Sequence, residues 1–215
     1  MKLQVIFMLV DYEIKRLCDN GFIVPYNPDH INPGSIDISL GDTAMIDKRD
    51  SFLKFIVILL SQLGFFKSGL WLQLSEKYPM LLQTYKQIIS DKKYFELIDF
   101  TQYNEDFPYW LAPNSCLLLS TKEYIDLPDD TACSLKLKSS RAREGLSHAL
   151  AGWIDNGFRG ILTLEIKNYS TKHHVPIYPG LRIGQLIIKR TNKPDKTYAG
   201  GRYADKYRVQ DSLDK

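Results

Sequence analysis

The sequence predicts a mainly β domain with an N-terminal helix and a helical insertion. Short alternating apolar runs, broken by proline and glycine, occupy residues 21–46, and a second set runs from residue 109 to about 190. Between them, residues 51–100 carry apolar side chains at helical spacing and few turn signals. The chain has 215 residues, which suits one compact domain with an elaboration. We therefore expect a single domain over 1–215, with the insertion at about 51–100 and a flexible C-terminal tail at 191–215.

The first expected element is a short helix that begins at Asp11, whose side chain suits a cap. Ile14, Leu17 and Cys18 fall on one side of it, and the pair Asn20-Gly21 ends it.

The insertion contains the most apolar stretch of the chain, residues 52–66. Its roughly 15 residues include Lys54 and fall short of the ~20 that a membrane-spanning helix needs. A buried helix or an oligomer contact is the favoured interpretation, and no membrane association is expected. The N-terminus shows no small-residue cleavage site, so a secretory signal is not expected either.

The segment "AGWIDNGFRGILTLE" predicts a turn followed by a half-buried strand. Asn156-Gly157 favours a type I′ hairpin because both residues tolerate positive φ. In the strand that follows, the apolar side chains share one face, and Glu165 points to the other. Glu165 therefore faces either solvent or a ligand.

Composition excludes several classes of function. The formal charge is only +3, which does not suit a protein that binds nucleic acid, so phosphate recognition should be local. The three cysteines are widely spaced and form no C-x-x-C pair, which argues against zinc and against a disulfide framework. A reducing cytoplasm is the expected location.

Three places have residues suited to chemistry. The first is the loop "LKLKSSRAREGL" (135–146), whose hydroxyl and guanidinium groups suit a phosphate or carboxylate, although a solvated polar loop is about equally expected. The second is the pair Asp155 and Glu165, each of which taken alone is more simply a turn residue or a surface carboxylate. The third is the tail segment 202–211, where Lys206 and Gln210 are able to close over an anion unless the terminus is disordered.

Taken in order, these features resemble the dCTP deaminases of the trimeric dUTPase superfamily. The resemblance rests on "PGSIDISLG", "LAPNSCLLLSTKEYIDLPDD", "KSSRAREGL", "AGWIDNGFRGILTLEIKN" and "VPIYPGLRIGQLII". It covers about 1–44 and 107–211 and leaves the stretch near 51–100 unmatched. It implies a distorted β-barrel, jelly-roll-like dUTPase fold that assembles as a homotrimer with shared active sites.

The resemblance also implies a set of site residues. Glu165 would carry the proton from water to the departing amine, with Ser139 and Arg143 beside it, and Arg143 would keep it ionised. Asp155 would bind the 3′-hydroxyl of the sugar, and Ala151 would present its backbone to the cytosine, supported by His148. The remaining substrate-binding residues are Lys138, Ser140, Trp153, Gln185, Tyr198, Lys206 and Gln210.

The implied substrate is dCTP, Mg²⁺ enters with the triphosphate rather than through protein ligands, and dTTP is a candidate inhibitor. Three positions depart from the family pattern: Lys138 stands where arginine is frequent, Leu150 where threonine is common, and Asn156 where proline is frequent.

The expected reaction is zinc-independent hydrolysis of dCTP to dUTP and ammonia, because a carboxylate replaces the metal that other nucleobase deaminases use to activate water. Two alternatives remain open. One is a dUTPase or a bifunctional enzyme that forms dUMP and pyrophosphate, and the other is a non-catalytic nucleotide-binding regulator.

Overall fold

The computed structural model describes residues 7–47, 95–149, 151–201, 204–207 and 209, together with residues 60, 63–69, 71, 73, 76 and 78. The chain divides into two compact units: Met1–Ile46 with Leu97–Lys215, and Asp47–Glu96. In the second unit the structure describes a short 3-10 helix, Phe65–Lys67, and a buried Trp71. Most of the expected helical insertion at 51–100 lies outside the described residues.

The first unit is built mainly from strands, as the alternating runs predict. The helices are α1 (Asp11–Asp19), the 3-10 helix η1 (Pro28–His30) and α5 (Ser139–Arg143). The strands are β1 (Phe7–Met8), β2 (Ile23–Val24), β3 (Ile31–Asn32), β4 (Ser35–Asp47), β5 (Phe95–Asp99), β6 (Tyr109–Leu111), β7 (Cys116–Asp126), β8 (Thr131–Leu137), β9 (Leu146–His148), β10 (Trp153–Ile154), β11 (Arg159–Asn168), β12 (Val175–Ile177) and β13 (Arg182–Arg190).

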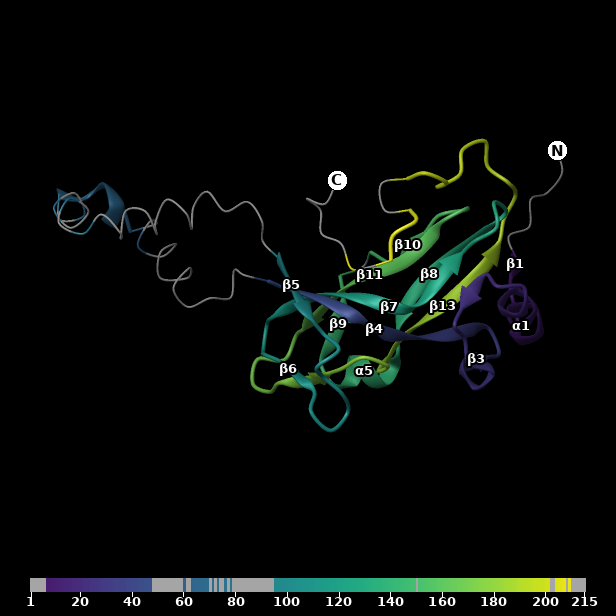
Figure 1. Cartoon of the computed structure of the whole chain (residues 1–215), viewed down its shortest axis with the longest axis horizontal. Helices are drawn as coiled ribbons and strands as arrows, with labels where there is room; N and C mark the ends of the chain where they lie inside the picture. The colour runs from purple at the N-terminus through teal and green to yellow at the C-terminus, as the bar shows by residue number, and fades with distance from the viewer. Residues whose placement is uncertain are drawn as a thin grey trace. The chain divides into compact units, whose positions relative to one another are not determined.

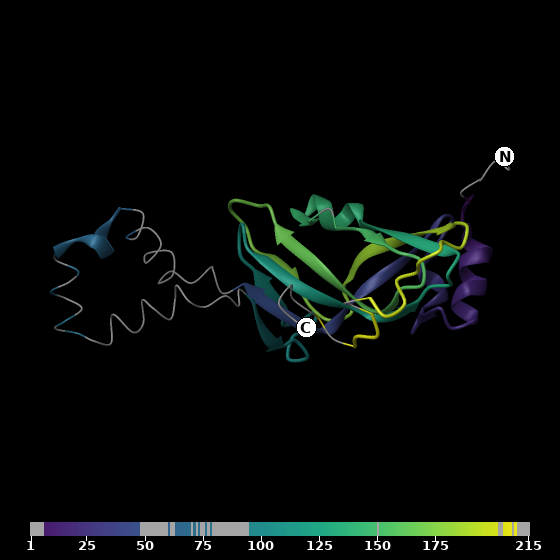
Figure 2. The same ribbon diagram turned by 90° about the horizontal axis from the view of Figure 1, so that it is seen from above.

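Most strands join one antiparallel sheet in the order β10-β8-β13-β4-β7-β11-β9. β1, β2, β3 and β5 pair with members of this path, and β6 pairs with β12 in a separate two-stranded sheet. The long strands cross and curl around one another instead of lying flat (Figures 1 and 2). Curling of this kind follows from strand twist and closes a large apolar face on itself.

The N-terminal helix is confirmed. Ile14, Leu17 and Cys18 are its buried residues, and Gly21 follows it with a φ of 83°. Asp11 is the first helical residue and not the cap, which is Val10. The carboxylate of Glu13 accepts a hydrogen bond from the Val10 N–H (3.1 Å). A side chain of the helix itself therefore satisfies this backbone N–H at the N-terminal end.

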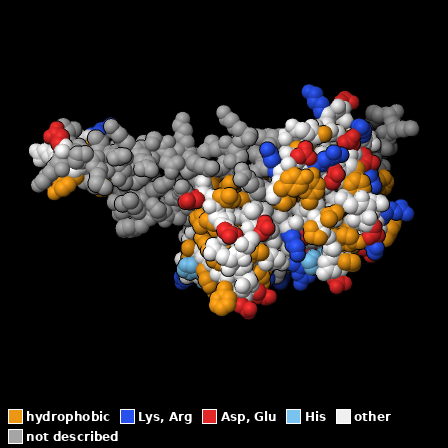
Figure 3. Space-filling view, viewed as in Figure 1, with side chains coloured by type: hydrophobic (Ala, Val, Ile, Leu, Met, Phe, Trp, Pro, Cys, Tyr) orange, Lys and Arg blue, Asp and Glu red, His pale blue; other side chains and the backbone are white. Residues whose placement is uncertain are grey.

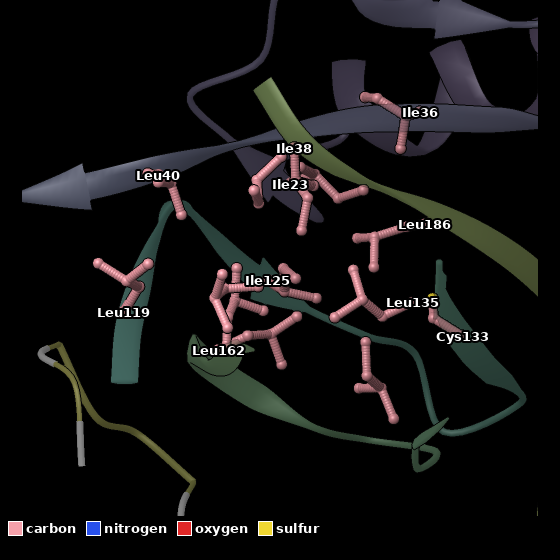
Figure 4. Packing of buried hydrophobic residues seen from close by; sticks show 14 of the residues in the cluster. Ile23, Ile36, Ile38, Leu40, Leu119, Ile125, Cys133, Leu135, Leu162 and Leu186 are labelled. Atoms are coloured by element: carbon pink, nitrogen blue, oxygen red, sulfur yellow. The ribbon is translucent and has the colours of Figure 1, made fainter. Parts of the chain in front are cut away.

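The core lies inside the curled sheet. On β4, Ile36, Ile38 and Leu40 are at most 1% exposed because alternate residues of a strand share a face. Figure 4 shows them packed with Leu119 and Ile125 of β7 and with aliphatic side chains from the neighbouring strands. The apolar contacts therefore come from segments far apart in the sequence.

The helical expectation is wrong for the end of the 51–100 stretch, since Phe95–Asp99 forms strand β5 and pairs with β4. Tertiary pairing overrides a weak local helical pattern here.

Among the described residues no helix is both long and apolar enough to cross a bilayer. On the face shown in Figure 3, basic, acidic and apolar side chains are intermixed, as the small net charge predicts.

Gly41 marks a close approach between β4 and β7. The register between these strands shifts between Leu40 and Ala44, and a Cβ at Gly41 would lie 2.6 Å from the carbonyl oxygen of Thr121 and 2.5 Å from Ser120 Oγ. The backbone atom cannot move aside without breaking the ladder.

We expect Gly41→Ala to lower the free energy of unfolding by about 1–3 kcal/mol, the usual cost of overpacking. Urea denaturation followed by circular dichroism measures this. Gly34→Ala is the matched control, because its Cβ would meet only Met8 Cε at 3.5 Å. Equal stability of the two variants would contradict the steric argument.

Candidate active site

Glu165 lies in the middle of β11, between β7 and β9. It stands opposite Leu118 of β7, and its carbonyl accepts from the Ala149 N–H just after β9 (3.2 Å). Leu162, Leu164 and Ile166 are buried on one face, so the predicted alternation is confirmed and the Glu165 side chain projects from the other face.

Within one chain, burial dominates the electrostatic setting of Glu165. Burial raises the pKa of its carboxyl, and its own backbone N–H opposes the rise only in part. Arg143, which the resemblance places beside this carboxyl, is exposed and is not among the groups that shift the pKa of Glu165 within one chain. A carboxyl with a raised pKa takes up a proton more readily, which suits a group that has to receive and release one.

The serine-rich segment after β8 forms the short helix α5, which replaces the predicted loop over part of 135–146. The Lys138 N–H donates to the Ile183 carbonyl (3.0 Å), which ties the start of α5 to the beginning of β13. Ser139 and Arg143 are four residues apart and share one exposed face of the helix. In the described part of the chain, no hydrogen bond or ion pair joins either of them to Glu165.

A second group of predicted residues gathers where α5 meets β4 and β13. Lys138 forms an ion pair with Asp37, a carboxylate only 3% exposed. Gln185 stands opposite Asp37 across the β4–β13 ladder, and its Oε1 accepts from Ser35 Oγ (3.2 Å). The structure thus pairs Lys138 with Asp37 and places Gln185 opposite Asp37 on the neighbouring strand.

Beside this group lies a cavity of about 290 Å³. Its lining is largely polar and includes two predicted residues, Lys138 and Ser140, together with Glu105, Arg141, Tyr178, Gly180, Leu181 and Arg182. Arg182 Nη1 lies 3.5 Å from Asp37, and Arg141 Nη1 lies 2.7 Å from Glu144. The cations are therefore partly neutralised by their neighbours.

Sequence reasoning missed Asp37. The signal was a carboxylate between Ile36 and Ile38, both fully buried, in the quoted "PGSIDISLG". A charge in such a run requires partners, and here they are Lys138, Arg182 and the Asn32 amide, which donates to Oδ1 (3.0 Å).

The loop between β9 and β10 passes directly over His148. A Cβ at Gly152 would lie 3.0 Å from His148 Cε1 and 2.6 Å from the Leu135 carbonyl oxygen, so only glycine fits. Burial, followed by the charge of Lys136, lowers the pKa of His148, and its buried Nδ1 has no partner among the described residues. An imidazole whose lowered pKa favours the neutral form therefore lies beneath the loop that carries the exposed Ala151.

The predicted hairpin at Asn156-Gly157 is wrong, although a turn is present. Gly157 has a φ of 73°, but Asn156 is not among the positive-φ residues, so the turn resembles type II and not type I′. The flanking strands do not pair with each other, because β10 pairs with β8 whereas β11 pairs with β7 and β9. The turn carries the chain from one end of the sheet toward the other and leaves Asp155 exposed.

Part of the described tail lies against this turn. The Tyr198 N–H donates to the Asn156 carbonyl (2.8 Å), and the Tyr198 ring packs on Phe158 with centroids 5.7 Å apart. Farther on, the Lys206 carbonyl accepts from the Ile161 N–H (2.9 Å). Gln210 lies outside the described residues.

One chain therefore places predicted residues in three separate groups: Glu165 with the His148 loop, Lys138 with Gln185, and Asp155 with Trp153 beside the turn that Tyr198 contacts. Each group is well defined, but the described contacts of one chain do not join them. In the described residues no cluster of three or more His, Cys, Asp or Glu is arranged to hold a metal ion.

The curled antiparallel sheet, with a half-buried carboxylate on β11, belongs to the dUTPase-like class of β folds. A family model described as "dCTP deaminase-like" matches residues 67–191. The chain belongs to the dCTP deaminase-like family.

Curated relatives match over nearly the whole chain. One from Streptomyces coelicolor, named "dCTP deaminase, dUMP-forming", is 31% identical over 94% of this chain and 91% of its own length. Another of the same name, from Nanoarchaeum equitans, is 36% identical over 91% of each chain. The alignments thus extend past the stretches on which the resemblance rested.

Among solved structures, a 2′-deoxycytidine 5′-triphosphate deaminase from Agrobacterium tumefaciens superposes with a TM-score of 0.55 at 18% identity. The match covers 86% of this chain and 48% of that one. This likeness supports the fold alone.

Proposed function

We propose that this protein is a bifunctional dCTP deaminase that converts dCTP to dUMP, ammonia and pyrophosphate. The observation that carries the proposal is full-length similarity to relatives named "dCTP deaminase, dUMP-forming". This favours the dUMP-forming alternative over release of dUTP, the reaction that the sequence motifs had put first.

In the deamination step, Glu165 takes a proton from water, and the oxygen attacks C4 of cytosine. The tetrahedral intermediate then collapses as the same carboxyl protonates the exocyclic nitrogen, which leaves as ammonia. The proton of the added hydroxyl passes to N3 as the C4 carbonyl of uracil forms. The raised pKa of Glu165 suits this double role, because the group has to be an effective base and then an effective acid. The neutral His148 backs the loop that meets the base.

In the second step, water attacks the α-phosphate of the bound dUTP, and the bond to the β-phosphate breaks to release dUMP and pyrophosphate. Lys138 and Gln185 hold the triphosphate, the first from its ion pair with Asp37 and the second from the position opposite Asp37 on β13. Tyr198 and Lys206 reach the triphosphate from the tail. Asp155 accepts from the 3′-hydroxyl. Mg²⁺ enters on the phosphate oxygens and keeps several waters, as this cation usually does when it binds with a nucleotide.

The separation of the three groups within one chain supports a site completed by a neighbouring subunit. Ser139 and Arg143 present an exposed helical face, as residues that act on a partner's nucleotide should. A homotrimer and competitive inhibition by dTTP are part of this proposal.

The test is product analysis with dCTP and Mg²⁺, with ammonia and pyrophosphate measured in parallel. We expect dUMP to accumulate with one ammonia and one pyrophosphate for each dCTP consumed. Accumulation of dUTP without pyrophosphate would restrict the protein to deamination. Binding of dCTP without turnover would instead support the alternative of a non-catalytic nucleotide-binding regulator with the same fold.

A further inference from the structure

Trp153 is an exposed side chain that is nevertheless held from two sides. Its side chain lies on β10 with 56% of its surface exposed. The indole Nε1–H donates to Asp155 Oδ1 (2.8 Å), and the ammonium of Lys189 lies 5.2 Å from the ring centroid. A hydrogen bond at the ring edge and a cation over its face together favour one orientation of the indole.

The register of the sheet explains how Lys189 reaches the ring. Trp153 stands opposite Ser134 of β8, and Ser134 stands opposite Ile187 of β13. Lys189 is two residues beyond Ile187, so it shares the same face of the sheet. Its Nζ also donates to Ser134 Oγ (3.2 Å), which holds the cation over β8 and beneath the indole.

Asp155 begins a turn whose backbone is fixed by its neighbours. The Phe158 N–H donates to the Asp155 carbonyl (3.2 Å), and the Asn156 side-chain amide donates to the Asp129 carbonyl (3.0 Å). The Asp155 carboxylate itself is exposed, and Trp153 supplies its one hydrogen bond from the described residues. With Oδ1 occupied, Oδ2 remains available to accept a hydrogen bond from a ligand.

We infer that Trp153, supported by Lys189, is a positioning residue that orients Asp155 toward the 3′-hydroxyl of a 2′-deoxynucleotide. This inference rests on the proposed function, in which Asp155 accepts from that hydroxyl. An exposed aspartate samples several rotamers, and fixing it only when the nucleotide arrives costs conformational entropy. Because the indole holds the carboxylate in place before the nucleotide binds, this entropy cost is lowered. Only substrates that carry the 3′-hydroxyl benefit from it.

The test compares dCTP with 2′,3′-dideoxy-CTP, which lacks only this hydroxyl. In Trp153→Phe the ring and its contact with Lys189 stay, but the N–H donor is lost. We expect kcat/KM for dCTP to fall about tenfold, as for a hydrogen bond to a charged group, with that for dideoxy-CTP unchanged. In an Asp155→Ala background the same substitution should cost nothing further, because it acts through Asp155.

Trp110→Phe is the matched control, since Trp110 is equally exposed (57%) on β6 and is not part of this network. Lys189→Met removes the cation from the face of the indole while the indole N–H stays intact. We expect a smaller loss of kcat/KM than in Trp153→Phe, again confined to dCTP. This second variant keeps the inference testable if Trp153→Phe folds poorly.

Equal losses on both nucleotides in Trp153→Phe and Lys189→Met would indicate a merely structural role and overturn the inference. Full retention of the preference for dCTP in both variants would overturn it as well, while leaving the proposed function intact. Wild-type protein that turns over dCTP and dideoxy-CTP equally would instead remove Asp155 from sugar recognition. Wild-type protein with no turnover of dCTP would contradict the proposed function itself.

Discussion

Glu165→Gln is expected to reduce kcat for deamination of dCTP by about 10²–10⁴-fold, the usual contribution of a positioned general acid–base. Glutamine keeps the shape of the side chain but can neither take the proton from water nor return it to the leaving amine. Because β11 is held on both sides by β7 and β9, the backbone should not move. Binding of dCTP should therefore survive the substitution.

The measurement is ammonia release in a coupled assay, with dCTP affinity determined separately by calorimetry. The pH profile of the wild type adds a second readout. Burial raises the pKa of Glu165 from its usual 4.5, and the base is active only when ionised. The loss of kcat/KM on acidification should therefore begin at a higher pH than it would for an exposed glutamate.

Glu76→Gln is the control, because Glu76 is exposed and belongs to the other compact unit of the chain. Deamination at the wild-type rate in Glu165→Gln would show that another group moves the proton. Loss of dCTP binding together with activity would indicate a binding role for Glu165 and not an acid–base role.

The second large effect concerns stability and arises at Glu123 of β7. Its side chain is 4% exposed, and both carboxylate oxygens lie within 3.1 Å of the Ser39 backbone nitrogen. Burial raises the pKa of this carboxyl from 4.5 to about 7, against the opposing effects of the Ser39 N–H and the charge of Lys122. The folded state therefore favours the protonated form.

The sign of the pH dependence follows from this difference. A carboxyl whose pKa is higher in the folded than in the unfolded chain contributes stability that is fully present below about pH 4.5 and is lost as the pH rises through about 7. The difference corresponds to about 3 kcal/mol. We expect the wild-type free energy of unfolding to fall by an amount of this order between pH 5 and pH 9.

Glu123→Gln should remove most of this dependence, because the amide stays neutral at every pH. Urea denaturation across the pH range measures it, and the variant should be more stable than the wild type at pH 9. Glu76→Gln, in an exposed position, should retain the wild-type slope. An unchanged slope in Glu123→Gln would mean that Glu123 is not the titrating group.

Several features of the fold and the site are local, and the sequence was enough to predict them. The helix that buries Ile14 and Leu17 and the alternation that turns Glu165 away from the core both follow from side-chain spacing, because each secondary structure repeats with its own period. The family resemblance rests on short motifs of the same local kind. From these motifs alone, the resemblance predicts Glu165, Lys138 and Asp155 as site residues.

Only the tertiary structure decided which strands pair and which charges meet. Asn156-Gly157 has the composition of a hairpin, yet its flanking strands find other partners, and Phe95–Asp99 joins β4 as a strand. Asp37 pairs with Lys138, about a hundred positions along the chain, and Lys189 of β13 reaches Trp153 of β10 across the intervening strand β8. Such pairings depend on the register of the whole sheet, a property of many segments at once that no single stretch of sequence carries.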